Sequence, residues 1–338
     1  DGLADLEGAM RKRQRVQMRS MSWQCIPMEL RDRVFGFLGD VEVRSAEEAF
    51  RWAAVLSGVG ITCEAVPATR IAAFMKAKCC RRLRLDPKAS TPKVLREVLA
   101  LHGFSLTSIK CLQEFEAERC DLLPAQVEAL AKAVLKSDSL RLVNLGGNLS
   151  LGDDGARCLG TSLKDQLSLH ELVLWGCGIG AEGSKELAKG LSENRALVAL
   201  DLSDNTNIGD IGAIALAGTI EKAHTKLKQL TLWNCGISSS GMLAFGKALR
   251  PNTCLQKLCL RGNTFKGNTC AEGFSKALCE NVHLKELNLA SCGIQGTDIV
   301  LLAQGLAENK SLSSLNLNAN KELGTTGADA LGVALQTN

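Results

Sequence analysis

The chain has 338 residues, 46% of them apolar, and a formal net charge of +4. That length and apolar content are enough for a large buried core, and the 32 glycines suit a fold with many turns. The charge is too small to predict a class of partner and gives no support for nucleic-acid binding. Because no apolar run approaches the roughly 18 to 20 residues of a membrane-spanning helix, we expect a soluble protein without a membrane span.

Residues 1–22 are polar and contain a basic run. The members of this run are Arg11, Lys12, Arg13, Arg15 and Arg19. Such a charge run is most often a solvated segment or a tail docked on a partner. We therefore expect 1–22 to be a basic tail, either flexible or held by another protein.

Residues 23–66 carry a short helical pattern in which a proline opens a helix that apolar side chains continue. The residues that define the pattern are Pro27, Glu29, Leu30, Phe35, Leu38, Asp40 and Trp52. The segment resembles an F-box, a small helical module that docks on the Skp-type linker subunit of a cullin ubiquitin ligase and often precedes substrate-holding repeats. The resemblance implies that docking, or the helical core of the module, depends on Pro27, Leu30, Phe35, Leu38 and Trp52.

An alternative stands beside the F-box for this segment. Glu47 and Glu48 lie where the second helix of an F-box usually continues apolar. The alternative is a plain helical cap that closes the N-terminal end of a stacked-repeat fold.

The pattern of residues 67–111 predicts helical segments at 71–84 and 92–101 and a short strand at 83–85. We interpret this segment as a degenerate first repeat that covers the edge of the sheet.

An internal repeat occupies the rest of the chain, residues 112–338. Each repeat reads Leu-x-x-Leu-x-Leu-x-x and closes alternately on cysteine or asparagine, with 28 to 30 residues between successive closing positions. The eight closing residues are Cys120, Asn148, Cys177, Asn205, Cys235, Asn263, Cys292 and Asn320. Self-similarity at such a period is the signature of a stacked-repeat protein, so eight repeats are expected here.

Each repeat combines two hydrophobic periods. Leu169, Leu172 and Leu174 alternate as in a half-buried strand, whereas Leu187 and Leu191, after a glycine turn, follow the spacing of an amphipathic helix. One strand and one helix cannot bury their own apolar faces, so neighbouring repeats must stack. We therefore predict an α/β solenoid with one parallel sheet on a concave face and helices outside, preceded by a small helical N-terminal region.

The paired repeats, with cysteine and asparagine alternating at the same position, resemble the ribonuclease-inhibitor-like leucine-rich repeat family. The resemblance covers about two thirds of the chain. It implies a horseshoe whose concave face binds proteins in most members of the family, and it does not identify the partner.

The closing residues also allow predictions about hydrogen bonding and about the state of the cysteine thiols. An asparagine amide at the end of each strand can both donate to and accept from the backbone of adjacent turns, and cysteine is a small, mostly buried substitute. The 14 cysteines have no spacing that fits a metal site or a disulfide between repeats, so we expect buried free thiols and neither metal nor cofactor. They favour an intracellular reducing compartment, cytoplasmic or nuclear, with an organelle left open.

One sequence pattern imitates a nucleotide-binding loop. Gly178, Gly180 and Gly183 form Gly-x-Gly-x-x-Gly between a predicted strand and helix. The corresponding turns of other repeats carry Ser238 and Gln295 at the second glycine position, so we interpret the pattern as an ordinary repeat turn and expect no small-molecule substrate.

The residues expected to face a protein partner are the variable positions of each strand. They start acidic and become basic along the array, with one tryptophan in each of two alternate repeats. These predicted concave residues are Glu114, Glu116, Glu118, Glu171, Trp175, Asp201, Asp204, Lys228, Trp233, Lys257, Arg261 and Lys285. Two exposed indoles beside mixed charges have the composition of an interface hot spot; the alternative is a pair of tryptophans covered by neighbouring side chains.

These features predict a non-catalytic interaction protein. Our first hypothesis is an adaptor whose arc binds a protein while the N-terminal helices dock on a second one, in the F-box case a Skp-type linker. The alternative is a structural scaffold subunit of a large assembly. A third, weaker hypothesis is a GTPase activator that presents a few side chains from its arc.

Overall fold

The computed structural model describes residues 61–62, 82–84, 113–133, 138–221 and 226–338. These residues form one parallel sheet of ten strands whose spatial order follows the sequence. The strands are β1 (Ile61–Thr62), β2 (Arg82–Arg84), β3 (Glu114–Glu116), β4 (Leu142–Asn144), β5 (Glu171–Val173), β6 (Ala199–Asp201), β7 (Gln229–Thr231), β8 (Lys257–Cys259), β9 (Glu286–Asn288) and β10 (Ser314–Asn316).

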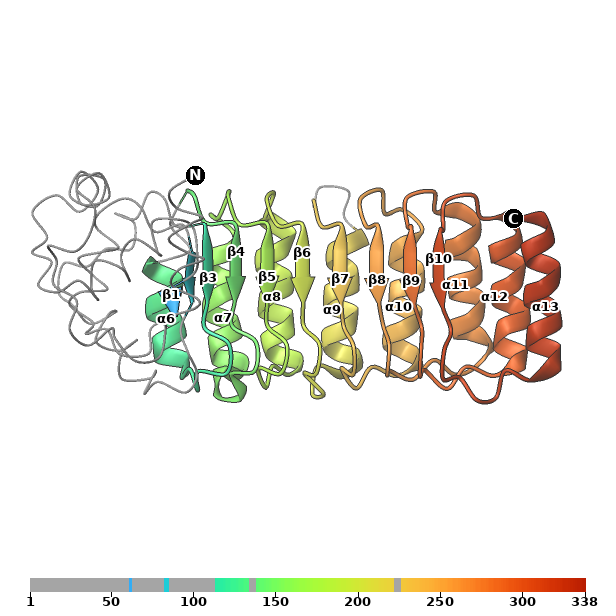
Figure 1. Cartoon of the computed structure of the whole chain (residues 1–338), viewed down its shortest axis with the longest axis horizontal. Helices are drawn as coiled ribbons and strands as arrows, with labels where there is room; N and C mark the ends of the chain where they lie inside the picture. Colours follow the sequence, from blue (N-terminus) through green and yellow to red (C-terminus); the bar gives the residue numbers. More distant parts are fainter. Residues whose placement is uncertain (1–60, 63–81, 85–112, 134–137, 222–225) are drawn as a thin grey trace, which may run out of the picture.

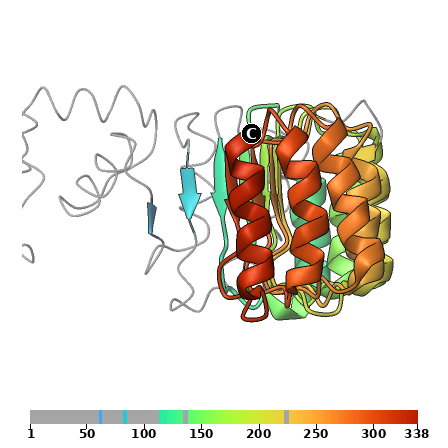
Figure 2. The ribbon, with the colours of Figure 1, turned by 90° about the vertical axis from the view of Figure 1, so that its right-hand side faces the viewer.

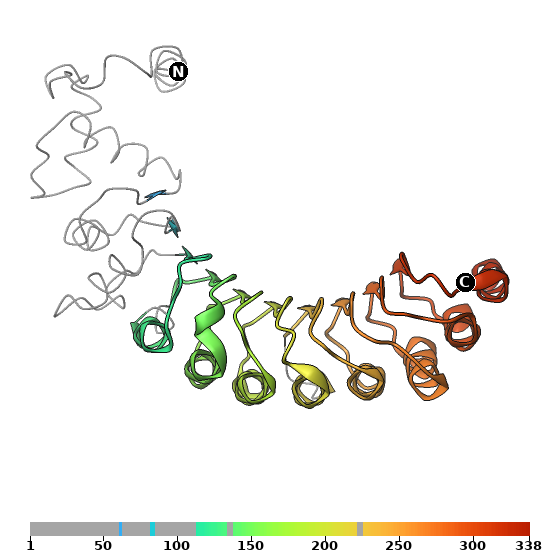
Figure 3. The ribbon, with the colours of Figure 1, turned by 90° about the horizontal axis from the view of Figure 1, so that it is seen from below.

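A helix follows each strand from β3 onward in the described part of the chain. The helices are α6 (Pro124–Ala133), α7 (Gly152–Leu163), α8 (Ala181–Glu193), α9 (Gly209–Glu221), α10 (Ser239–Leu249), α11 (Asn268–Glu280), α12 (Gly296–Glu308) and α13 (Gly324–Thr337). Seen along the strand direction, the strands line the inside of an arc and the helices its outside (Figure 3). The predicted α/β leucine-rich repeat solenoid is thereby confirmed.

The core lies between the sheet and the helices. The middle residue of a typical strand, such as Leu172 in β5, is fully buried, while its neighbours Glu171 and Val173 face the concave side. Leu187 from α8 packs into the same apolar cluster. Burial of every second strand residue explains why the regular leucines alternate in the sequence.

The helices stack side by side at close range (Figure 2). A Cβ atom on Gly190 of α8 would lie 2.0 Å from the carbonyl oxygen of Gly160 in α7. A side chain at this point would therefore force the two helices apart, which accounts for glycine there.

The closing asparagines form a buried polar ladder, as predicted. Asn205 accepts hydrogen bonds from the amides of Cys177 (2.9 Å) and Ile179 (3.0 Å). Its amide group donates to the carbonyls of Leu174 and Leu202, both at 2.8 Å. The same four contacts recur at Asn148, Asn263 and Asn320. Each asparagine thus pairs the backbone groups of two consecutive turns.

A second ladder runs along the C-terminal ends of the helices, and sequence reasoning missed it. Asn194 donates to the carbonyls of Leu163 (2.6 Å) and Gln166 (2.8 Å) and accepts from the amide of Leu197 (2.8 Å). Equivalent buried asparagines are Asn252, Asn281 and Asn309. These side chains satisfy helix carbonyls that have no partner within their own helix.

The residue before each closing residue has a left-handed backbone. The eight φ angles lie between 53° and 74°, at Arg119, Gly147, Gly176, Asp204, Asn234, Gly262, Ser291 and Ala319. This conformation reverses the chain direction immediately after the strand. Five of the eight positions carry a side chain, which the turn directs out of the core and which is therefore available to a partner.

The sheet extends further toward the N-terminus than the repeats do. The short strand expected at 83–85 occurs one residue earlier, as β2, and pairs with β3. Strand β1 lies inside the 23–66 segment, where no strand was expected, and it pairs with β2. The F-box-like residues Pro27, Leu30, Phe35, Leu38 and Trp52 and the basic tail lie outside the described residues, and the proposed domain boundaries stay predictions.

Among the described residues, no helix has both the length and the apolar character that crossing a bilayer requires.

Candidate protein-binding surface

Most of the predicted concave residues lie where the repeat pattern places them, on the strands or in the turns that follow. Glu114 and Glu116 are strand residues of β3, and Glu171, Asp201 and Lys257 occupy strand ends. The turn positions hold Glu118, Trp175, Asp204, Trp233 and Arg261. Lys228 and Lys285 lie one residue before β7 and β9 and are exposed at the N-terminal ends of these strands. The predicted set therefore spreads over both ends of the strands and over the face of the sheet.

The basic end of the predicted surface is interrupted by an acidic residue that sequence reasoning missed. Glu286, the first residue of β9, forms an ion pair of 2.8 Å with Lys257 on the neighbouring strand. Both side chains are about half exposed, so water screens the pair and its contribution to stability is small. The pair nevertheless removes Lys257 from the set of uncompensated cations. Arg261 and Lys285 remain without an ion pair among the described residues.

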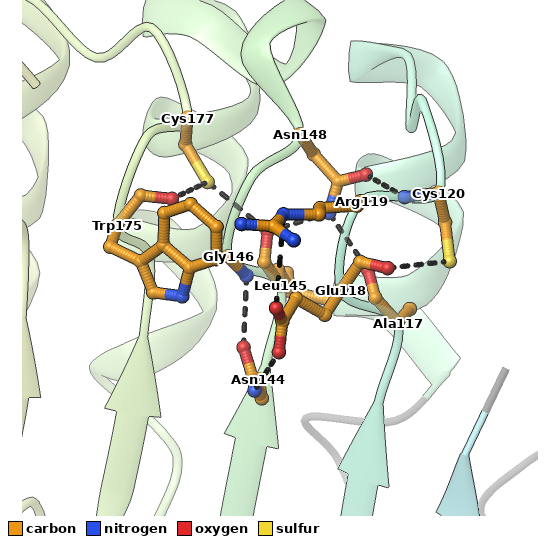
Figure 4. Close-up of polar contacts among 10 residues, drawn as sticks. All are labelled: Ala117, Glu118, Arg119, Cys120, Asn144, Leu145, Gly146, Asn148, Trp175 and Cys177. Atoms are coloured by element: carbon orange, nitrogen blue, oxygen red, sulfur yellow. Dashed lines mark hydrogen bonds and ion pairs between the residues drawn. The ribbon is translucent and has the colours of Figure 1, made fainter. Parts of the chain in front are cut away.

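Trp175 is partly covered, as one of the two alternatives for the tryptophans predicted. Its ring lies against the turn of the preceding repeat, where a Cβ atom on Gly146 would come within 2.1 Å of the indole nitrogen. The guanidinium of Arg119 lies 5.0 Å from the ring centre (Figure 4). An arginine over an indole face at this distance forms a cation–π contact.

A chain of contacts holds Arg119 in place. Arg119 approaches Glu118 at 4.0 Å, and Glu118 accepts a hydrogen bond of 3.4 Å from Asn144. The other side-chain atom of Asn144 accepts from the amide of Gly146 at 2.9 Å (Figure 4). Glu118 and Asn144 therefore lie beside the stack of Arg119 on Trp175 in the free protein.

Trp233 is more exposed than Trp175, and its ring leans toward the following repeat instead of the preceding one. It is 38% exposed and lies against Gly262 of the following repeat, 3.2 Å from a Cβ atom at that glycine. The guanidinium of Arg261 lies 5.4 Å from its ring centre. Each tryptophan of the pair therefore carries an arginine, on the side that faces away from β6.

The Gly-x-Gly-x-x-Gly turn has no room for a phosphate. Asp153 in α7 accepts hydrogen bonds from the amides of Gly180 (2.6 Å) and Gly183 (2.9 Å) at the start of α8. These are the amides that would bind an anion at a helix N-terminus. The protein's own carboxylate fills that place, and Asp210 likewise accepts from the amides of Ser238 and Gly241 at the start of α10.

The closing cysteines are structural thiols. Cys177, Cys235 and Cys292 are buried and unpaired, and each donates to a leucine carbonyl of an earlier repeat at 3.1 to 3.3 Å. Burial raises the pKa of Cys177 to about 12 and that of Cys292 to about 11. Within the described ranges, no group of three or more histidine, cysteine or acidic side chains could hold a metal ion.

Sequence reasoning missed Arg119, Asn144 and Glu286. Arg119 precedes a closing cysteine, outside the leucine pattern, and its contact with Trp175 spans two repeats. Glu286 carries the same strand position as the predicted Lys257 and could have been found by listing that position in every repeat.

Comparisons with known proteins agree with this architecture. The family described as leucine rich repeat matches residues 193–217, 280–303 and 308–332. Ribonuclease inhibitors are similar over the whole array. The protein from Sus scrofa is 31% identical over 230 residues, covering 66% of this chain and 49% of the inhibitor, and the protein from Mus musculus is 31% identical over 231 residues with the same coverage.

Other relatives match over the same length. The "NACHT, LRR and PYD domains-containing protein 5" of Homo sapiens is 32% identical over 229 residues, which is 66% of this chain and 18% of that protein. The chain thus spans about half the length of the ribonuclease inhibitors that it matches and less of the larger protein. Among solved structures, a leiomodin-1 actin-binding fragment aligns with 46% of this chain and 90% of the fragment, at 17% identity and a TM-score of 0.36.

The alternating cysteine and asparagine ladder, the paired strand and helix repeats and the inhibitor relatives agree with one another. In its repeats and in its sequence the chain is similar to the ribonuclease-inhibitor-like leucine-rich repeat proteins.

Proposed function

We propose that this chain is a non-catalytic protein-binding protein whose concave face, centred on Trp175 and Trp233, contacts the partner. The observation that carries the proposal is the pair of arginine–indole stacks, Arg119 on Trp175 and Arg261 on Trp233. Tryptophan and arginine are the residue types most enriched among the energetic centres of protein interfaces. Rings that are already fixed lose little conformational entropy when a partner binds.

The test is affinity capture with the full chain, compared with a Trp175→Ala, Trp233→Ala double variant. We expect the variant to lose the partner while keeping its thermal stability, because both rings lie at the surface rather than in the core. Leu167→Ala is a matched control, since that side chain is 75% exposed and lies in the loop that leads into β5. Equal capture by the double variant and the control would refute the concave site.

The adaptor role is a separate part of the proposal. The F-box resemblance of the N-terminal segment supports docking on a Skp-type linker, with the arc holding a substrate. A Leu30→Ala, Phe35→Ala variant should then lose the linker and cullin but keep the partner of the arc. Recovery of a constant set of assembly subunits without linker or cullin would instead favour the scaffold alternative.

A further inference from the structure

We propose that the concave face holds a partner segment in which one basic side chain lies between two acidic ones. The proposal rests on the protein-binding function above and specifies the chemistry of the partner. It concerns one row of residues, in the turns that follow β3 to β8.

The two indoles diverge from the middle of this row. Trp175, after β5, leans over Gly146 toward β4, whereas Trp233, after β7, leans over Gly262 toward β8. The turn after β6 lies between the turns that carry the two indoles. It carries Ser203, which is buried, and Asp204, which is partly exposed.

Two carboxylates occupy this middle position. One oxygen of Asp201 accepts from the amide (2.9 Å) and the hydroxyl (2.6 Å) of Ser203, and one oxygen of Asp204 accepts from the side-chain amide of Asn234 at 3.0 Å. Neutral donors thus hold both groups in place. Across the described ranges of the chain, neither carboxylate has a salt bridge, in contrast to Glu286 with Lys257. Their negative charge is uncompensated in the free protein.

The flanks of the row have the opposite charge. The guanidinium groups of Arg119 and Arg261 lie on the outer faces of the indoles. Arg119 also approaches Glu118, but at 4.0 Å and with 67% of its side chain exposed, so water screens this pair and the guanidinium stays accessible to a partner. The order along the row is cation, indole, carboxylate, indole, cation. Arg119 follows β3 and Arg261 follows β8, three strands and two strands from the turn of Asp204 after β6. Since adjacent strands are about 4.8 Å apart, these turn positions are spaced by roughly 14 Å and roughly 10 Å.

This order of charges favours one class of partner segment over others. A uniformly basic surface would meet Arg119 and Arg261, and a uniformly acidic one would meet Asp201 and Asp204, so like charges would disfavour both. A segment with acidic, basic and acidic groups spaced by about 14 Å and about 10 Å matches all three positions. In an extended chain, which rises about 3.3 Å per residue, these spacings correspond to about four residues and about three residues.

The test uses two synthetic peptides of equal composition. The matching probe is acetyl-Glu-Gly-Gly-Gly-Arg-Gly-Gly-Glu-amide, and the control probe is acetyl-Arg-Gly-Gly-Gly-Glu-Gly-Gly-Glu-amide. Each is titrated into the full chain labelled with ¹⁵N, and the indole NH signals of its four tryptophans are followed. We expect the matching probe to shift the signals of Trp175 and Trp233 with a Kd on the order of 1 mM, and the control probe to bind at least about tenfold more weakly.

Protein variants complete the test. Asp204→Arg should abolish the preference for the matching probe, and the fold tolerates arginine there because Arg119 occupies the equivalent turn position with the same left-handed backbone. Glu286→Gln is the matched control and should change nothing, since that carboxylate already has a partner.

Equal shifts with the two probes, shifts that persist in Asp204→Arg, or no shift with the matching probe would each overturn the charge order. The protein-binding function fails separately, if capture survives the loss of Trp175 and Trp233. Capture that depends on the tryptophans but not on Asp204 would leave the binding surface standing and refute only the proposed partner chemistry.

Discussion

Arg119 and Trp175 are 56 residues apart in the sequence, yet the guanidinium carbon of Arg119 lies 5.0 Å from the centre of the Trp175 ring. The contact is possible because the repeat between them carries Gly146 and Gly147 at the turn that the indole crosses. The Trp175 ring can take this position because the intervening repeat has no side chains at Gly146 and Gly147.

Gly146→Ala should displace the indole of Trp175. The added methyl group would lie 2.1 Å from the indole nitrogen, and the side chain can escape only by leaving Arg119. We expect a changed indole NH signal and about tenfold weaker partner capture, roughly 1.4 kcal/mol. Gly218→Ala in α9 is the control: a Cβ there meets nothing within 4 Å, so binding should be unchanged. An unmoved Trp175 signal in Gly146→Ala would contradict the packing described.

Asn205→Ala should destabilise the protein strongly. The substitution removes four hydrogen bonds to buried backbone groups of two repeats. Each buried group left without a partner costs about 1 to 3 kcal/mol, so we expect a loss of at least about 3 kcal/mol in urea unfolding. Asn207→Ala, at an exposed turn position nearby, should stay within about 0.5 kcal/mol of the parent protein. Similar losses in both variants would rule out the ladder as a main source of stability.

Asp153→Ala should weaken the start of α8. Its carboxylate replaces the missing side-chain cap of that helix by accepting from Gly180 and Gly183. Losing a helix cap costs about 0.5 to 2 kcal/mol, measurable as a lower thermal midpoint. The adjacent Asp154→Ala removes only an exposed ion pair with Arg157 and should cost less than about 1 kcal/mol. If the two variants melt alike, the carboxylate is not acting as a cap.

The buried thiols predict a loss of stability at alkaline pH. Burial raises the pKa of Cys177 to about 12 and that of Cys292 to about 11, from 9.0 for a free thiol. Above pH 9 the unfolded chain loses these protons while the folded protein keeps them, so the free energy of unfolding falls as pH rises toward 11.

The measurement for this prediction is urea unfolding at pH values between 8 and 11. The stabilising effect of the protonated thiols is fully present below pH 9, so stability should change little there through these groups. A Cys177→Ala variant should show a shallower decline, because one titrating group has been removed. A decline of unchanged slope in that variant would assign the pH dependence to other groups.

Sequence reasoning predicted the repeat unit, the order of its strand and helix, and the residues of the buried ladder. These predictions succeed because each of them depends on contacts between equivalent positions of adjacent repeats, which recur every 28 to 30 residues. Leu172 is buried and Asn205 is hydrogen-bonded for reasons that every repeat shares.

The candidate binding surface was only partly predictable. The sequence identified Trp175, Trp233 and the acidic positions, because the repeat pattern tells which residues leave the core. It predicted a simple change from acidic to basic, whereas the pair of Lys257 with Glu286 breaks that sequence of charges. It also missed the asparagine ladder of the helix ends, because those residues lie outside the leucine pattern.

The directions in which the two indoles lean, and the cations that they meet, could not be predicted from the repeat pattern. A ring at the surface of a solenoid packs against whichever neighbouring turn lacks a side chain. Gly146 lies on one side for Trp175, and Gly262 lies on the opposite side for Trp233. Such choices depend on individual residues in adjacent repeats and not on the periodic pattern, so they became visible only when the repeats were stacked.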